Sequence, residues 1–253
     1  MKNFLIKIYQ FINCFTEKHM NQIYLDINKY NNIPKKAFFI ALEINNGLKM
    51  FCLGVNFEAV SQSLIILRQL TEQVCFLNII SNHNECFEAV ELFSKLKLDS
   101  LRYDLNSDIN IKKKYKESKD LISQMYSDVK KKFPKTKKLT VKDFLDYGWM
   151  LEITDECGVE KLYGIANFKE IKKWRTYLNS LVHNTFSFYQ NDSNEQQRLI
   201  IEATYFVMSL LDVYMYSYHN LTDYEFIIDN NNFRDNFISL YDEFITLKKN
   251  NKF

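Results

Sequence analysis

The sequence predicts an all-α protein, and three observations support that prediction. The 253 residues include only 5 glycines and 2 prolines, fewer than a β-sandwich, a β-barrel or a Rossmann fold of this length normally needs. Hydrophobic residues make up 47% of the chain, enough to fill a large core. Apolar residues recur at spacings of three and four along most of the sequence, which is the period of an α-helix. We therefore expect a single-domain bundle of about eight helices.

The N-terminal third of the chain is expected to form three helices. The first spans residues 2–30 and ends before Pro34, because proline has no amide hydrogen with which to continue a helix. The second spans residues 35–53 and is expected to end at Gly54, since glycine commonly terminates helices. The third, residues 57–82, is apolar on nearly every side, which is typical of a central helix.

The third predicted helix also carries two charged residues, Arg68 and Glu72, four positions apart. A charge that is buried without a partner is strongly destabilising, so both side chains must be paired or hydrogen-bonded. One interpretation is an ordinary salt bridge, either between the two or with a neighbouring helix. The other is that both border the same polar cavity as His183.

The middle of the chain holds its one strongly basic stretch. A fourth helix is predicted over residues 85–105, followed by a charged helix over 109–133 that Pro134 stops. We interpret residues 109–140 as a Lys-rich insertion that protrudes from the bundle. It is either a solvated helical hairpin or a surface that contacts nucleic-acid phosphates. The candidate phosphate contacts are Lys130, Lys131, Lys132, Lys137 and Lys138.

The remainder of the chain is predicted to be helical with one interruption. A short helix over residues 141–147 is followed by a stretch, Asp155–Gly164, that has the composition of a loop. Three amphipathic helices complete the bundle, over residues 168–188, 195–219 and 232–249.

The helix over residues 168–188 carries the most chemically suggestive pattern. Arg175, Asn179 and His183 are each four residues apart, so they lie along one side of the helix, while Leu178 faces a core. Histidine titrates near neutral pH and can act as a general acid or base, and a cation can stabilise the charge that develops on a phosphate. This stripe is a candidate site for binding or cutting a phosphodiester. His183 remains open to two other interpretations: a structural histidine hydrogen-bonded to Glu72 or a tyrosine, and a metal ligand.

Several classes of protein are excluded by missing motifs. The sequence has no glycine-rich nucleotide-binding loop, no GxSxG nucleophile motif and no HExxH motif, and it has only four histidines. We therefore expect no cofactor and no metal. Its five scattered cysteines indicate reduced thiols in a cytoplasmic protein. The N-terminus lacks the pattern of a signal peptide, and the charges of Arg68 and Glu72 argue against a membrane span.

Two blocks of the sequence resemble a known family. The block Tyr177–Asn184, Y-L-N-S-L-V-H-N, looks like the signature of a bacterial domain-of-unknown-function family that is often considered HEPN-like. The helix Leu64–Val74 is similar to the upstream helix of that family, in which Arg and Glu stand four apart. The resemblance places a HEPN-like core at about residues 35–220. It implies an all-α, dimeric, metal-independent endoribonuclease that acts in anti-phage defence or as a toxin.

The resemblance also implies roles for particular residues. The HEPN motif is an Arg, then four to six residues, then His, often with a polar residue directly after the Arg. Asn179 and His183 match the polar position and the His, whereas Arg175 stands one residue too far upstream. His183 would be the general acid and base, Asn179 the orienting group, and either Arg175 or Arg68 the phosphate clamp. Glu72 would fix the imidazole or the arginine.

A second hypothesis needs no catalysis. The chain would be a helical sensor or adaptor module of a defence system, using its aromatic C-terminal helices for a protein partner and the Lys-rich insertion for nucleic acid. The partners expected under the two hypotheses are a second copy of the chain, RNA, and a protein from the same operon, with no membrane. The net charge of +2 neither requires nor excludes a nucleic-acid partner.

Overall fold

The protein is almost entirely helical wherever its structure is defined. The computed structural model describes residues 2–26, 35–83, 86–93, 124, 127–128, 131–132, 134, 147–155, 158–166, 174–180, 193–222 and 231–249. Every regular element in these ranges is a helix, so the all-α prediction is confirmed. The chain divides into two compact units: unit 1 combines Met1–Asn82 with Phe168–Phe253, and unit 2 is His83–Asn167.

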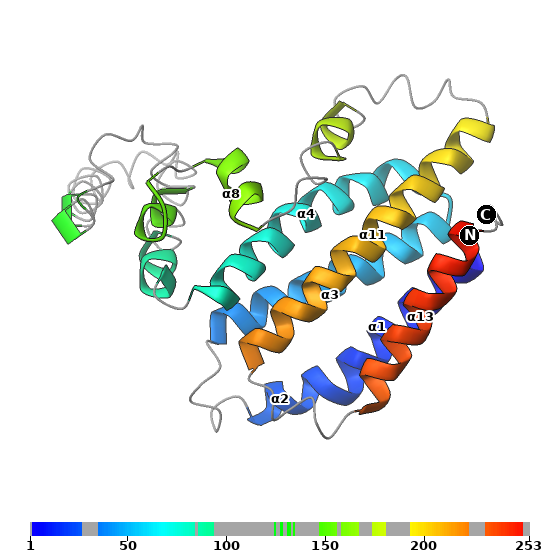
Figure 1. Ribbon diagram of the computed structural model, residues 1–253, viewed down its shortest axis with the longest axis horizontal. Coiled ribbons are helices and arrows are strands. Elements are labelled where there is room, and N and C mark those ends of the chain that lie inside the picture. Colours follow the sequence, from blue (N-terminus) through cyan, green and yellow to red (C-terminus); the bar gives the residue numbers. More distant parts are fainter. Residues whose placement is uncertain are drawn as a thin grey trace, which may run out of the picture. The chain divides into compact units, whose positions relative to one another are not determined.

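Three long helices form the centre of unit 1. They are α3 (Lys35–Asn56), α4 (Val60–Asn82) and α11 (Ser193–Thr222), and α4 contacts both of the others (Figure 1). The buried residues of α4 cover one broad side of the helix from Val60 to Leu77, and Ile79 and Ile80 near its end are buried outside that side. By length and composition alone, segments of all three helices are apolar enough to cross a membrane. About half of each such segment is buried inside the protein, where it forms the core of unit 1.

Two glycines bring α3 and α4 unusually close together. Gly47 of α3 lies against the side chain of Leu70 of α4. Two turns further along α3, Gly54 lies against Ser63, which stands two turns before Leu70 on α4. The prediction that Gly54 ends the second helix is therefore wrong, because Gly54 serves close packing and α3 continues to Asn56. The turn is made instead by Glu58, whose φ of 63° lies in the left-handed region.

The N-terminal helix is interrupted where the sequence predicts a continuous one. It comprises α1 (Lys2–Phe15), a π-helical turn (Thr16–Met20) and α2 (Asn21–Asp26). The turn includes one extra residue relative to an α-helix and therefore redirects the side chains that follow. It lies against α3, as does α1.

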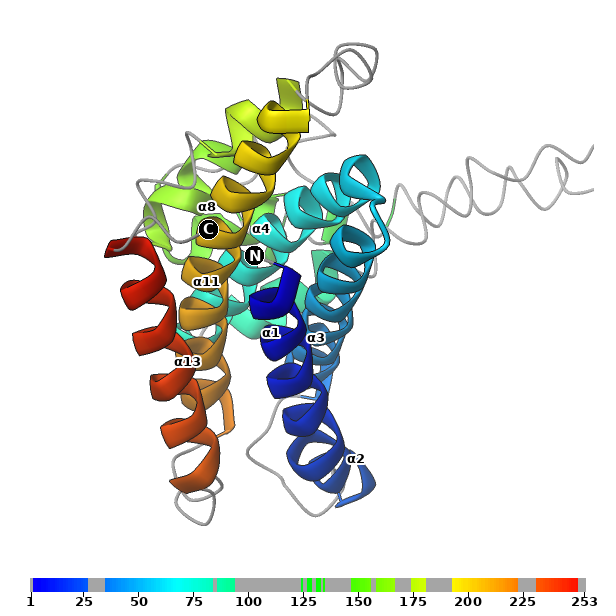
Figure 2. The same cartoon turned by 90° about the vertical axis from the view of Figure 1, so that its right-hand side faces the viewer.

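The C-terminal helix α13 (Asn231–Lys249) contacts the N-terminal helix α1, beside which it lies in Figure 1; in the view of Figure 2 the two are seen on either side of α11. The contact is largely aromatic: the rings of Phe4 and Phe244 lie 6.0 Å apart, and those of Phe11 and Phe237 lie 5.8 Å apart. The two pairs show that α1 and α13 run antiparallel.

Polar side chains connect α11 to its two central neighbours. The amide of Asn78 on α4 donates to Ser217 Oγ at 3.0 Å, and Asn220 Nδ2 donates to Asn82 Oδ1 at 3.0 Å. On the other side, the buried hydroxyl of Tyr214 donates to the backbone oxygen of Ala41 on α3 at 3.1 Å. Because buried polar groups must be satisfied, the buried bond of Tyr214 and the partly buried bond of Asn78 help to fix the register of α11, whereas the bond of Asn220 is exposed.

Unit 2 corrects one prediction. The stretch Asp155–Gly164 was expected to be a loop, yet α8 (Val159–Ile165) occupies most of it. Gly158, with a φ of 128°, precedes the helix, and Leu162 and Tyr163 are buried. The loop prediction relied on the glycines and overlooked these apolar positions.

Of the fourth predicted helix, residues 86–93 are described and helical, whereas most of the Lys-rich insertion and residues 141–146 lie outside the described residues.

Candidate functional site

Four of the five predicted catalytic residues meet in unit 1. Arg68 and Glu72 lie on α4, and Arg175 and Asn179 lie on the helical segment 174–180. Arg68 Nε donates a hydrogen bond to Asn179 Oδ1 at 2.5 Å. Arg175 Nε lies 3.7 Å from Glu72 Oε1. We call these four residues the polar cluster.

The pairing follows from two equal spacings. Each helix presents two polar residues four positions apart, and such residues lie one above the other on the same side. The first residue on α4, Arg68, meets the second residue on the other segment, Asn179, and Glu72 meets Arg175. The two stretches therefore run antiparallel, and both contacts form in one register.

Apolar contacts hold segment 174–180 in place beside the cluster. Leu178 is fully buried. The indole of Trp174 stacks on the ring of Phe206 in α11, with centroids 4.9 Å apart and planes inclined by 15°. Tyr177 meets the same indole edge-on at 5.7 Å. These contacts leave the polar side of the segment facing α4.

The polar cluster keeps an excess of positive charge. Two guanidinium groups face one carboxylate, so its formal charge is +1, and its members are only partly buried. The Arg175 and Glu72 side chains are 23% and 40% exposed, so at 3.7 Å their ion pair contributes at most about 1 kcal/mol. Arg68 makes no other hydrogen bond or ion pair among the described residues, so its terminal N–H groups are available to an anion.

The remaining predicted site residues fall into two groups. His183 lies outside the described residues, as do Lys130, Lys137 and Lys138. Lys131 and Lys132 are exposed in unit 2, where Lys131 lies 3.6 Å from Asp128 and Lys132 pairs with Glu88. Within the described ranges, His, Cys, Asp and Glu side chains form no group of three that could hold a metal ion.

A buried polar cluster beside the π-helical turn was missed by the sequence reasoning. The π-helical turn directs Thr16, His19 and Met20 inward, and Asn45 of α3 donates to both Thr16 Oγ1 and Met20 Sδ. The ring of His19 meets that of Tyr218 edge-on at 5.8 Å, and burial lowers the pKa of His19 to about 4. Since these residues are at most 7% exposed, we assign them to the core rather than to a site.

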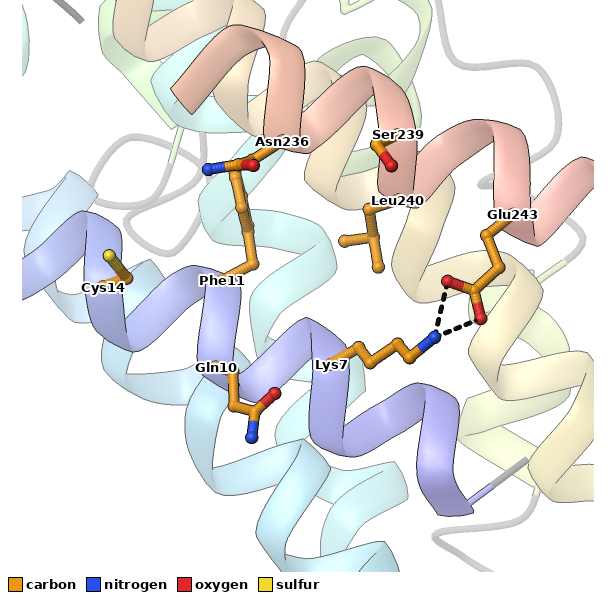
Figure 3. A pocket seen from close by; sticks show the side chains of 8 residues that line it. All are labelled: Lys7, Gln10, Phe11, Cys14, Asn236, Ser239, Leu240 and Glu243. Carbon is orange, nitrogen blue, oxygen red and sulfur yellow. Dashed lines mark hydrogen bonds and ion pairs between the residues drawn. The ribbon is translucent and has the colours of Figure 1, made fainter. Parts of the chain in front are cut away.

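A groove between α1 and α13 lies apart from the predicted chemistry. Its volume is about 340 Å³, and an ion pair between Lys7 and Glu243 at 2.6 Å crosses one end (Figure 3). Phe11 and Leu240 form its apolar part, and Cys14 lies at the other end. None of the residues that line this groove is a predicted catalytic residue, whereas the polar cluster brings four of them together. The polar cluster is therefore the better candidate for a functional site.

Comparisons with known proteins leave the family open. A scan against protein-family models finds no match, and searches of curated proteins and of solved structures find no similar protein. The resemblance to HEPN-like proteins therefore stays a prediction, and the functional argument rests on the polar cluster itself.

Proposed function

We propose that the chain is a HEPN-like, metal-independent endoribonuclease of the cytoplasm, acting in anti-phage defence or as a toxin. One observation carries this proposal: the hydrogen bond between Arg68 and Asn179. The motif in segment 174–184 lacks an arginine at the usual place, and this bond brings a guanidinium from α4 to the residue that matches the motif. Arg68 thereby supplies the missing cation.

Each residue then has a role in cleaving a phosphodiester bond. His183 takes the 2′-hydroxyl proton and protonates the leaving oxygen, since an imidazole titrates near the working pH. Arg68 stabilises the negative charge that develops on the phosphate. Asn179 holds Arg68 in place, and Glu72 does the same for Arg175. The proposed partners are RNA and a second copy of the chain, with a protein from the same operon as a regulator.

The test is RNA cleavage by the purified chain in EDTA. We expect the wild type to cleave mixed RNA, and His183→Ala and Arg68→Gln each to lose about 100-fold or more in rate. The control is Arg198→Gln, because the Nε of Arg198, like that of Arg68, contacts one side chain, here Glu202, but Arg198 is 79% exposed on α11. Cleavage that survives Arg68→Gln, or falls equally in Arg198→Gln, would contradict the proposal.

One observation favours the adaptor hypothesis instead. Arg175 and Glu72 are paired with each other, and this contact docks segment 174–180 on α4 without requiring any catalysis. In that case the wild type should not cleave RNA, and Arg68→Gln and Asn179→Ala should lower the melting temperature without changing any activity. Measuring cleavage and melting on the same variants separates the two hypotheses.

A further inference from the structure

One side of α3 carries large apolar side chains that face away from the core of unit 1. Phe39 and Met50 on α3, and Phe57 in the following turn, are 43%, 56% and 80% exposed, and Leu53 is half-buried. With Glu43 and Asn46 they recur at alternating spacings of four and three, which is the repeat of a coiled-coil seam. We call this set the outer stripe: Phe39, Glu43, Asn46, Met50, Leu53 and Phe57.

The outer stripe lies opposite the buried side of α3. At about 100° per residue, its members fall within roughly 60° of Asn46. The residues that face the core are Phe38, Ala41, Ile44, Leu48, Phe51 and Val55, all at most 1% exposed. The stripe continues onto α2, where the ring of Tyr24 meets that of Phe39 at 6.0 Å and Leu25 is 79% exposed. The exposed apolar side chains therefore gather at both ends of the stripe, with Glu43 and Asn46 between them, and this much apolar exposure on one side of a helix indicates an interaction site.

We propose that the outer stripe binds the same stripe of a second copy of this chain, with the two α3 helices antiparallel and Asn46 at the two-fold axis. In such an arrangement, a residue before position 46 lies level with the residue equally far after it in the other copy. Phe39 then lies level with Leu53 of the partner subunit, and Met50 lies level with Leu42 of the partner subunit, a half-buried residue at the edge of the stripe. Glu43 lies level with Lys49 of the partner subunit.

Charge and polarity select this register. Glu43 and Lys49 stand three residues on either side of Asn46, so an antiparallel pair places opposite charges at the same level twice. A shift of the axis to position 48 would set Glu43 against Leu53 and Asn46 against Met50. An asparagine can donate to and accept from its own copy, and an asparagine at a seam position is a known determinant of register. The inference rests on α3 and stands whether or not the chain cleaves RNA.

The size of the stripe sets the expected affinity. A helix of 22 residues, as α3 is, measures about 33 Å, so one helix pair buries less surface than a typical stable dimer. We therefore expect a reversible dimer with a dissociation constant on the order of 10 μM.

Charge reversal tests the register on the full chain. Sedimentation equilibrium between about 1 and 200 μM should show the mass rising from 30.3 kDa toward twice that value. Because each substitution acts twice in a symmetric dimer, Glu43→Lys and Lys49→Glu should each raise the dissociation constant about tenfold. The double variant Glu43→Lys/Lys49→Glu restores opposite charges and should return toward the wild-type value. A double variant as weak as either single variant would overturn the proposed register.

A disulfide tests the two-fold axis. Asn46→Cys should form a covalent dimer on mild oxidation, because each copy places position 46 beside its equivalent. Ile238→Cys, at a position on α13 that is 45% exposed, is the matched control and should remain largely monomeric, as should the wild type. The proposal is overturned if the wild type stays monomeric over the whole concentration range. This includes the case in which the monomer pellets with lipid vesicles and Met50→Lys abolishes that binding, because the outer stripe would then bind a membrane rather than a second copy. The proposal is also overturned by equal cross-linking of the two cysteine variants.

Discussion

α3 and α4 approach closely at Gly47, and the effect of Gly47→Ala on the free energy of unfolding should depend on Leu70, the side chain that Gly47 faces. A Cβ added at Gly47 would lie 2.6 Å from Leu70 Cδ2 and 3.3 Å from its Cγ, whereas carbon atoms in contact prefer about 3.5–4.0 Å. Leu70 is only 1% exposed, so it has little room to move. Overpacking of this kind costs about 1–3 kcal/mol, and replacing a helical glycine by alanine returns about 1 kcal/mol. Gly47→Ala should therefore lower the free energy of unfolding by about 1 kcal/mol.

Gly47→Ala should become stabilising once the side chain of Leu70 is removed. Leu70→Ala removes the clashing atoms and should itself lower the free energy of unfolding by about 2–5 kcal/mol. In that background Gly47→Ala keeps its gain in helix propensity and meets no side chain, so it should raise the free energy of unfolding by about 1 kcal/mol. The expected coupling between the two sites is thus about 2 kcal/mol.

Urea denaturation followed by far-UV circular dichroism measures all four proteins of this cycle. Gly164→Ala in α8 is the control for helix propensity alone, because nothing lies within 4 Å of the added Cβ. It should raise the stability of its helix. If Gly47→Ala is as favourable in the wild type as in the Leu70→Ala background, the packing argument is refuted.

Three further predictions follow from buried side chains. Burial lowers the pKa of His19 from 6.5 to about 4, so the unfolded chain takes up a proton first as the pH falls, and stability is lost between these values. At about 1.4 kcal/mol per pH unit, the drop in unfolding free energy from about pH 7 to 5 should be about 2 kcal/mol smaller in His19→Phe, and an unchanged drop would contradict the assignment. Tyr214→Phe removes the hydrogen bond to the Ala41 oxygen and should cost about 1 kcal/mol in urea denaturation; a cost near zero would mean that this bond contributes nothing. Burial raises the pKa of the Cys52 thiol to about 12, whereas Cys14 is partly exposed; mass spectrometry after brief alkylation should find Cys14 modified and Cys52 modified only after unfolding.

Helices were predictable because their signal is local. The predicted bounds for α4, α11 and α13 agree with the structure to within three residues, since hydrophobic periodicity is set by neighbours along the chain. Local composition failed where a residue acts on a distant one. Gly54 was interpreted as a helix end, yet its contact is with Ser63.

The sequence predicted which residues belong to the polar cluster, but it did not predict which of them contact each other. Spacing shows that Arg68 and Glu72 share one side of a helix and that Arg175 and Asn179 share another. Which helices are neighbours, and in which direction they run, depends on contacts across more than 100 residues of chain, as the bond from Arg68 to Asn179 illustrates. The π-helical turn was missed for the same reason, because the partners of its inward side chains come from α3 and α11.

The division of unit 1 between the two ends of the chain has a consequence during synthesis. The apolar surface of α4 that α11 eventually covers leaves the ribosome first, and Ser193, where α11 begins, follows about 110 residues after Asn82. At translation rates of about 5–20 residues per second, that surface waits roughly 6–20 s for its partner. A nascent chain in this condition is a natural client for chaperones, and slower elongation would lengthen the interval in which it can aggregate.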